Sequence, residues 1–175
     1  MRVLKIIFLF LFMSTYLIAD IQFVKGAKNA WRKGEYQKAI NILEPYAQKG
    51  ITRALILLAA IYVDAPIQIR NYAKAEKYYK LAVNQGDPIA MRELAFLYMS
   101  TRRFHEAMEL FNRIAKYNDK ITLESMVYMY CGVYHPYFKR DLYQCAYWIK
   151  RAKSVGISDP YFAKFWREYK LWNYE

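Results

Sequence analysis

The chain has 175 residues, of which 56% are hydrophobic and 18% aromatic, and its formal net charge at pH 7 is +12. This composition excludes a disordered or low-complexity chain, because the apolar content is sufficient to build a buried core. The positive charge favours an anionic partner, either an acidic protein, an anionic envelope polymer or lipid headgroups, and a solvated basic surface without a partner is the alternative.

The start of the chain, 1–19, predicts a secretory signal peptide. Arg2 and Lys5 precede an almost wholly apolar stretch at 6–18, and Ala19 offers a small residue at the expected cleavage point. This apolar run is shorter than the ~20 residues that a bilayer crossing needs, so a retained anchor is the weaker alternative. We therefore expect cleavage after Ala19 and a periplasmic or secreted protein, with membrane contact only if the leader is retained. Export also argues against nucleic acid as a partner.

Apolar residues recur at helical spacing through the rest of the chain, and no strand pattern accompanies them. Gly50 and Gly86 predict helix C-termini, and the pair Asp87 and Pro88 predicts a capped helix start. Pro45 should bend or shorten the helix that contains it. The predicted helices are, in chain order, one that ends before 34, then 35–48, 52–63, 72–85, 88–100, 104–116, 122–130, 142–154 and 161–172.

Four stretches of the chain carry the same spaced residues. A small residue recurs at intervals of 36, 32 and 38 residues, at Ala39, Ala75, Ala107 and Cys145. Eleven residues beyond each of these stand Gly50, Gly86, Asn118 and Gly156. A period near 35 with helical patterning predicts stacked helix pairs, which present a binding surface rather than a reaction centre. The small residues would let neighbouring helices approach closely.

These repeats resemble the Sel1-like and tetratricopeptide repeat superfamily. The stretch ALILLAAIY at 54–62 is similar to the first helix of a Sel1-like unit. The stretches YAKAEKYYKLA at 72–82 and NQGD at 84–87 are similar to its second helix and turn, and GEYQKAI at 34–40 resembles the tetratricopeptide turn. The resemblance covers about 25–156.

The resemblance implies an all-α fold, a right-handed α-solenoid of about four antiparallel helix pairs with a C-terminal capping helix. The Gly-rich connecting loop that is usual in Sel1-like units is absent after Tyr62 and Tyr98, which leaves the loop paths there open. We expect a single repeat domain at 20–175. Its parts are predicted to be repeats at about 20–50, 51–86, 87–119 and 120–157, and a capping helix at 160–172.

The resemblance also implies that the first helix of each repeat lines a concave groove. In this register the groove residues are Lys28, Arg32, Arg53, Ile56, Arg92, Phe96, Glu124 and Tyr128. Arginine and aromatic residues are favoured in protein interfaces, so we expect a partner to bind here, and a solvated helix face is the alternative. Aromatic residues in a separate loop, 134–138, are expected to pack over the last helix pair or to form a second contact surface.

No catalytic residue, cofactor site or metal site is expected. His105 and His135 have no second ligand at metal-binding spacing, so both are interpreted as surface residues. The sequence has neither a Gly-rich phosphate loop nor a G-x-S-x-G motif. Cys131 and Cys145 fall on the two helices of the last repeat, and an even cysteine count in an exported chain favours a disulfide, with two buried thiols as the alternative.

We therefore expect an exported, non-catalytic protein–protein interaction module that binds an acidic partner. The resemblance implies an adaptor or regulator, or an immunity protein that neutralises a toxin in the periplasm. Binding to anionic envelope polymers such as peptidoglycan is the second hypothesis. Hydrolysis of β-lactams, proposed for some cysteine-rich relatives, is the third, but this chain lacks their dense cysteines and any catalytic set.

Overall fold

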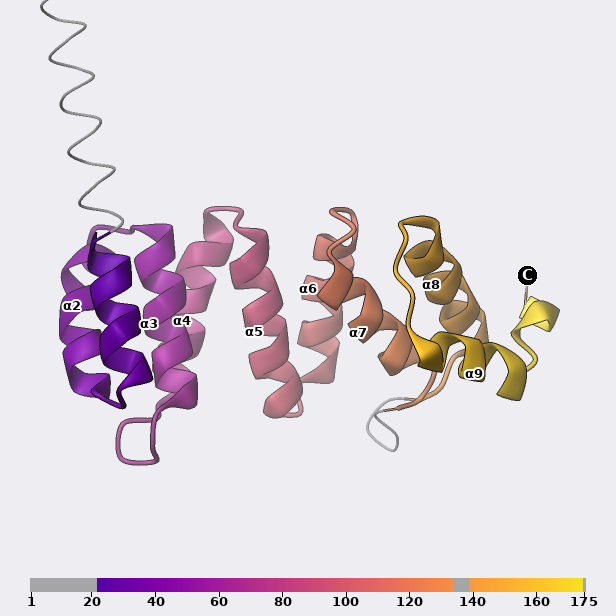
Figure 1. Ribbon diagram of the computed structural model, residues 1–175, viewed down its shortest axis with the longest axis horizontal. Coiled ribbons are helices and arrows are strands. Elements are labelled where there is room, and N and C mark those ends of the chain that lie inside the picture. The colour runs from indigo at the N-terminus through magenta and orange to yellow at the C-terminus, as the bar shows by residue number, and fades with distance from the viewer. Residues whose placement is uncertain (1–21, 134–138, 175) are drawn as a thin grey trace, which may run out of the picture. The chain divides into compact units, whose positions relative to one another are not determined.

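The computed structural model describes residues 22–133 and 139–174, and all regular structure within them is helical (Figure 1). The predicted signal peptide and the aromatic loop at 134–138 lie outside the described residues. The described helices are one at 22–32, α2 (Tyr36–Gln48), α3 (Thr52–Asp64), α4 (Tyr72–Asn84), α5 (Pro88–Ser100), α6 (Phe104–Ala115), α7 (Lys120–Tyr130), α8 (Leu142–Ser154), α9 (Pro160–Glu168) and the 3-10 helix η1 (Leu171–Tyr174). The all-α expectation is confirmed.

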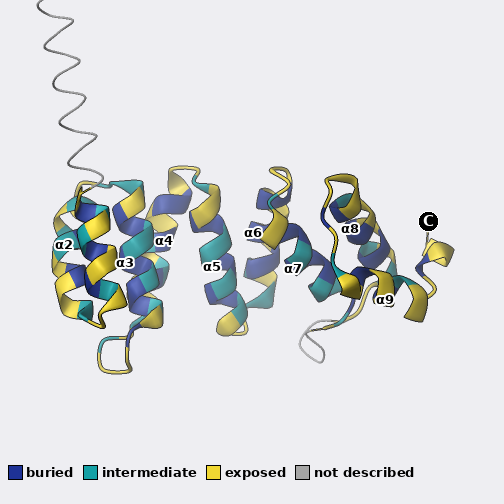
Figure 2. Cartoon of the chain, viewed as in Figure 1, coloured by how far each residue is buried: buried dark blue, intermediate teal, exposed yellow. Residues whose placement is uncertain are grey.

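The tertiary contacts divide the chain into two compact units, one that ends at Ala90 and one that begins at Met91. In the first unit, α3 packs against both α2 and α4. In the second unit, α7 packs against α6 and α8, and η1 packs against α8 and α9. Within each unit the buried residues lie where helices face one another, and the exposed residues lie on the outer surfaces and turns (Figure 2).

The small residues that define the repeat lie in the core. Ala39, Ala75, Ala107 and Cys145 are each 0% exposed. Large side chains four residues further on, such as Leu43, Tyr79 and Phe111, are also buried. Small and large residues thus alternate along the second helices, which lets the helices approach closely while the core remains filled.

The turn that follows the second helix of each pair has the same backbone conformation in all four repeats. Gly50, Gly86 and Gly156 have φ values of 74°, 82° and 82°, and Asn118 at the equivalent position has 54°. This left-handed conformation closes the C-terminus of a helix, and asparagine is the residue other than glycine that adopts it most readily. The repeat register inferred from the sequence is therefore confirmed in the backbone.

Of the two effects expected of Pro45, a bend or a shorter helix, the shortening does not occur. α2 continues through Pro45 and ends at Gln48. Proline removes the hydrogen bond to the carbonyl four residues earlier, that of Asn41. Both Asn41 and Pro45 are exposed, so water can hydrate the freed carbonyl and the helix tolerates the break.

Two helix boundaries in the second unit differ from the prediction by two residues or more. α7 begins at Lys120 rather than at 122, because the Asp119 carboxylate accepts a hydrogen bond from the Thr122 amide at 2.9 Å and caps the helix. The closing helix α9 ends at Glu168 rather than at 172. Lys170 has a φ of 49°, which breaks the helix before η1.

The two cysteines form a disulfide in the structure. Cys131, at the end of α7, is bonded to Cys145 in α8, with their Cα atoms 4.9 Å apart. Both are completely buried. The bond joins α7 to α8, and Cys145 is itself the small repeat residue of this last pair.

A larger side chain at Ala75 should overpack the interface between α4 and its neighbours. We expect Ala75→Leu to lower the free energy of unfolding by about 1–3 kcal/mol, because the site has no free volume. Ala73, exposed on the same helix, provides the matched control, and Ala73→Leu should change stability by less than about 0.5 kcal/mol. Urea denaturation followed by circular dichroism measures both. Equal effects at the two positions would contradict the packing inferred here.

Removal of the disulfide should destabilise the second unit. The bridged residues are 14 apart in sequence, and a closed loop of that size contributes about 3 kcal/mol. We expect the double variant Cys131→Ala/Cys145→Ala to unfold at lower urea concentration than the oxidised protein. The intact mass under denaturing conditions, with and without reduction and alkylation, tests the bond directly. Two alkylated cysteines without prior reduction would contradict it.

Candidate interaction surfaces

The first unit has an open hollow of about 470 Å³ where its first helices end. Lys28, Trp31 and Arg32 reach it from the helix at 22–32, where their spacing of three and four residues places them on one face. Tyr36 lines it from the first position of α2, and Asp64 from the last position of α3. Two cations, two aromatic rings and one carboxylate therefore converge on this hollow.

Trp31 and Asp64 are joined across the hollow. The Trp31 indole Nε1 donates a hydrogen bond of 2.8 Å to Oδ2 of Asp64. Lys28 and Arg32 are exposed, and within the described residues no ion pair engages either of them. Their charges are therefore available to a ligand that enters the hollow.

The other two predicted groove residues of this unit lie elsewhere on α3. Arg53 is exposed and Ile56 is half-buried. They precede Asp64 by two to three helical turns, and neither lines the hollow. The structure thus brings together Lys28 and Arg32 from the predicted set, and adds Trp31, Tyr36 and Asp64 to them.

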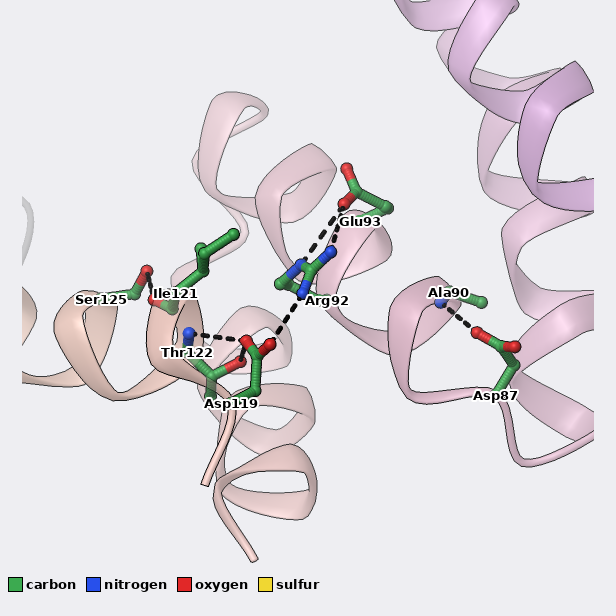
Figure 3. A network of polar contacts seen from close by, with 8 residues as sticks. All are labelled: Asp87, Ala90, Arg92, Glu93, Asp119, Ile121, Thr122 and Ser125. Atoms are coloured by element: carbon green, nitrogen blue, oxygen red, sulfur yellow. Dashed lines mark hydrogen bonds and ion pairs between the residues drawn. The ribbon is translucent and has the colours of Figure 1, made fainter. Parts of the chain in front are cut away.

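In the second unit, Arg92 is engaged in an internal ion pair. Figure 3 shows its side chain reaching from α5 to Asp119, with 2.9 Å between Nη1 and the carboxylate Oδ1. Arg92 also approaches Glu93 at 3.4 Å, and its side chain is only 17% exposed. The same Asp119 accepts hydrogen bonds from the backbone amide and the hydroxyl of Thr122. Arg92 therefore positions the start of α7.

The electrostatics of Asp119 follow from these contacts. Burial alone would raise the pKa of this carboxyl. The two hydrogen bonds from Thr122 and the charge of Arg92 favour the ionised form more strongly, so the pKa lies below its ordinary value. The carboxylate is thus held ionised as a cap and an ion-pair partner.

Tyr128 makes an equivalent connection one repeat further along. Its hydroxyl donates a hydrogen bond of 2.6 Å to Oδ2 of Asp159, which caps α9 by accepting from the Tyr161 amide. The Tyr128 ring also packs edge-on against Phe162 and Phe165. Burial, together with the hydrogen bond to Asp159, raises the pKa of Tyr128 well above its usual value, so the hydroxyl stays a donor.

The remaining predicted groove residues, Phe96 and Glu124, also contact neighbouring side chains. The half-buried Phe96 packs edge-on against Phe111, with ring centroids 5.4 Å apart. Glu124 is 23% exposed and lies 3.7 Å from the Lys120 ammonium group. In the second unit, therefore, the predicted groove residues hold the fold together as well as facing outward.

Sequence reasoning missed Trp31, Asp64, Asp119 and Asp159 as members of these contacts. Asp119 and Asp159 each precede a helix, so the capping pattern identifies them as N-caps. Their second role, as acceptors for Arg92 and Tyr128 from 27 and 31 residues away, depends on the tertiary arrangement.

The described residues contain no group of three or more His, Cys, Asp or Glu side chains that could hold a metal ion. His105 lies 3.5 Å from Glu109, and both are exposed, whereas His135 falls outside the described part of the chain. Over 22–133 and 139–174, no helix combines the length and the apolar character that a membrane crossing requires.

Comparison with known proteins supports the repeat fold. No protein-family model matches the chain. Over 68 residues, 39% of this chain, it is 35% identical to a Sel1-like repeat-containing protein of Acanthamoeba polyphaga mimivirus, and the match spans 12% of that relative's length. At this coverage the match shows a shared repeat rather than a shared role.

Two crystal structures have a similar fold. A Sel1 repeat protein from Oxalobacter formigenes matches with a TM-score of 0.57 and 20% identity, over 76% of this chain and 55% of that one. A protective antigen present in uropathogenic Escherichia coli strains, which displays the SLR fold, matches with a TM-score of 0.54 and 23% identity, over 66% of this chain and 25% of that one. The chain therefore has the α-solenoid fold of these Sel1 repeat structures.

Loss of the Asp119 charge should destabilise the second unit in a pH-dependent way. Asparagine caps helices as well as aspartate does, so Asp119→Asn removes the Arg92 ion pair and costs about 1 kcal/mol at neutral pH. Because the folded pKa is lowered, the stabilisation is present above the unfolded pKa of about 3.9 and is lost as the pH falls through the folded value. The difference between the two proteins should therefore shrink as the pH falls below about 4.

Urea denaturation across this pH range measures the difference. Asp141→Asn is the matched control, since Asp141 caps α8 through the Gln144 amide without an ion pair among the described residues. Its effect at pH 7 should be smaller. A stability difference for Asp119→Asn that does not change with pH would refute the ion-pair contribution.

Proposed function

We propose that the protein is an exported, non-catalytic interaction module that binds an acidic partner protein, as an adaptor or regulator or as an immunity protein. The observation that carries this proposal is the hollow of the first unit, where Lys28 and Arg32 present charges that no described residue neutralises. The aromatic rings of Trp31 and Tyr36 line the same hollow, and aromatic residues with arginine dominate binding energy at interfaces.

The physical basis is a surface presented by the packed helices of the first unit. Trp31 is fixed by its hydrogen bond to Asp64, so little side-chain freedom is lost when a partner binds. The excess of basic over acidic residues, which remains after cleavage at Ala19, steers an acidic partner toward the protein at a rate that falls with ionic strength. Export places the partner in the periplasm or outside the cell, and this rests on the signal peptide predicted at 1–19.

The second candidate function is binding of anionic envelope polymers such as peptidoglycan. The outer surface of α8 favours it, because Tyr143 and Tyr147 are 62% and 47% exposed and the helix contains no acidic residue. An open hollow of about 540 Å³ lies there, lined by Asn118, Tyr147, Lys150, Arg151, Ser154 and Val155. Exposed aromatic rings beside cations suit a sugar polymer that bears carboxylates.

Capture from an envelope extract tests the leading proposal. The wild-type protein should retain an acidic protein, and Lys28→Glu/Arg32→Glu should reduce its retention at least tenfold, because attraction becomes repulsion. Lys25→Glu/Lys33→Glu is the matched control, with the same charge change on exposed residues of the same segment that do not line the hollow.

Sedimentation with cell-wall sacculi at rising salt separates the two candidates. A polymer bound by surface charge should be released as screening grows, whereas a packed protein interface should largely persist. Retention that is equal for all variants would contradict the role of the first-unit hollow. Binding to sacculi alone would replace the protein partner with the polymer.

A further inference from the structure

The hollow of the first unit contains charges of both signs that do not neutralise one another. Lys28 and Arg32 line it together with Asp64, yet no ion pair joins them among the described residues. Instead, one Asp64 oxygen is held by the Trp31 indole at 2.8 Å. The cations and the carboxylate are thus separately accessible from the same cavity of about 470 Å³.

The position of Asp64 is electrostatically unfavourable for the fold. It is the last residue of α3, and the C-terminus of a helix carries partial negative charge that repels a carboxylate. Asp64 is also exposed, and the indole hydrogen bond could be accepted equally well by a neutral asparagine. Helix stability therefore does not explain the negative charge at this position.

We propose that this hollow binds an isolated acidic side chain that lies beside an aromatic residue in a partner protein segment, and that Asp64 excludes ligands with contiguous negative charges. This inference rests on the proposed function and specifies its partner. The ligand carboxylate lies between Lys28 and Arg32, where charge-assisted hydrogen bonds form, and the neighbouring aromatic ring packs on Trp31 and Tyr36.

Exclusion of polyanions would follow from charge repulsion by Asp64, which lines the same hollow as the two cations. A second carboxylate next to the first would approach Asp64, and like charges in close contact weaken binding about fivefold even in water. A protein segment with one carboxylate avoids this repulsion, but an acidic polymer with a charge on every unit does not. The basic residues by themselves would attract both protein segments and acidic polymers. Asp64 would make the hollow selective for the protein segment.

Two synthetic peptides test this inference on the full chain as exported. One is acetyl-Gly-Phe-Glu-Gly-amide, and the other is acetylated, amidated tetraglutamate. The reporter is the NMR signal of the Trp31 indole N–H, which is assigned by its loss in Trp31→Phe. The indole signals of Trp148, Trp166 and Trp172, all in the second unit, serve as internal controls. Millimolar peptide is sufficient to reveal weak binding.

We expect the Phe-Glu peptide to shift the Trp31 signal and to leave the other three unchanged, and its glutamine analogue to bind at least tenfold more weakly. Lys28→Gln/Arg32→Gln should abolish the shift, and Lys25→Gln/Lys33→Gln should retain it. Asp64→Asn, which preserves an acceptor for the indole, should strengthen tetraglutamate binding about fivefold. It should change Phe-Glu binding by less than twofold.

The outcomes distinguish this inference from the proposed function. Absence of a Trp31 shift, a shift that survives Lys28→Gln/Arg32→Gln, or an Asp64→Asn variant that does not favour tetraglutamate would overturn the inference. If the native partner is nevertheless captured, the proposed function stands without this site. If the peptide results are as expected but no protein partner is captured, the site stands and the proposed function fails.

Discussion

The close approach of helices at one small residue per repeat is the constraint on which the rest of the structure depends. Ala39, Ala75, Ala107 and Cys145 are completely buried, and their small side chains allow close helix packing within each unit. A single helix pair cannot bury both of its faces, and the stack does so by repetition. Each turn must then have the same geometry, which the recurring left-handed residue after the second helix provides.

Polar contacts about one repeat apart fix the helices that this packing brings together. Among the first helices, Arg92 contacts Asp119 and Tyr128 contacts Asp159. The turns that follow the second helices are linked as well, because Gln85 donates to the Gly50 carbonyl at 2.7 Å. In the second unit, Arg151 donates hydrogen bonds to the Ala115 carbonyl at 3.0 Å and to Asn118 Oδ1 at 3.2 Å. These bonds satisfy carbonyls at helix ends and set the spacing of neighbouring repeats.

The same contacts divide the basic residues into two groups with different consequences. Arg92 and Arg151 are occupied by partners within their own unit, so they contribute stability. Lys28 and Arg32 have no described partner and face an open hollow with aromatic walls. The net charge of the chain does not distinguish these two groups of basic residues, but their contacts do. Lys28 and Arg32, the group without a described partner, are in the first unit, which is why the functional proposal concerns that unit.

Local pattern by itself determined the helices, the repeat register and the positions of the buried small residues. These depend on spacing along the chain, since a helix places residues three and four apart on one face and a glycine or asparagine closes its end. The same local stretches also carry the resemblance to the Sel1-like and tetratricopeptide repeat superfamily. The same local reasoning did not foresee that α2 continues through Pro45 to Gln48, at a site where Asn41 and Pro45 are exposed.

Only the tertiary structure decided which polar residues are available for binding. Trp31 meets Asp64, and Tyr128 meets Asp159, across 33 and 31 residues of chain. Such pairs depend on how neighbouring repeats are stacked, and no periodicity within one helix encodes the distance between two helices. The sequence therefore named Lys28 and Arg32 as candidates, and the fold placed the Asp64 carboxylate and the Trp31 and Tyr36 rings around the same hollow.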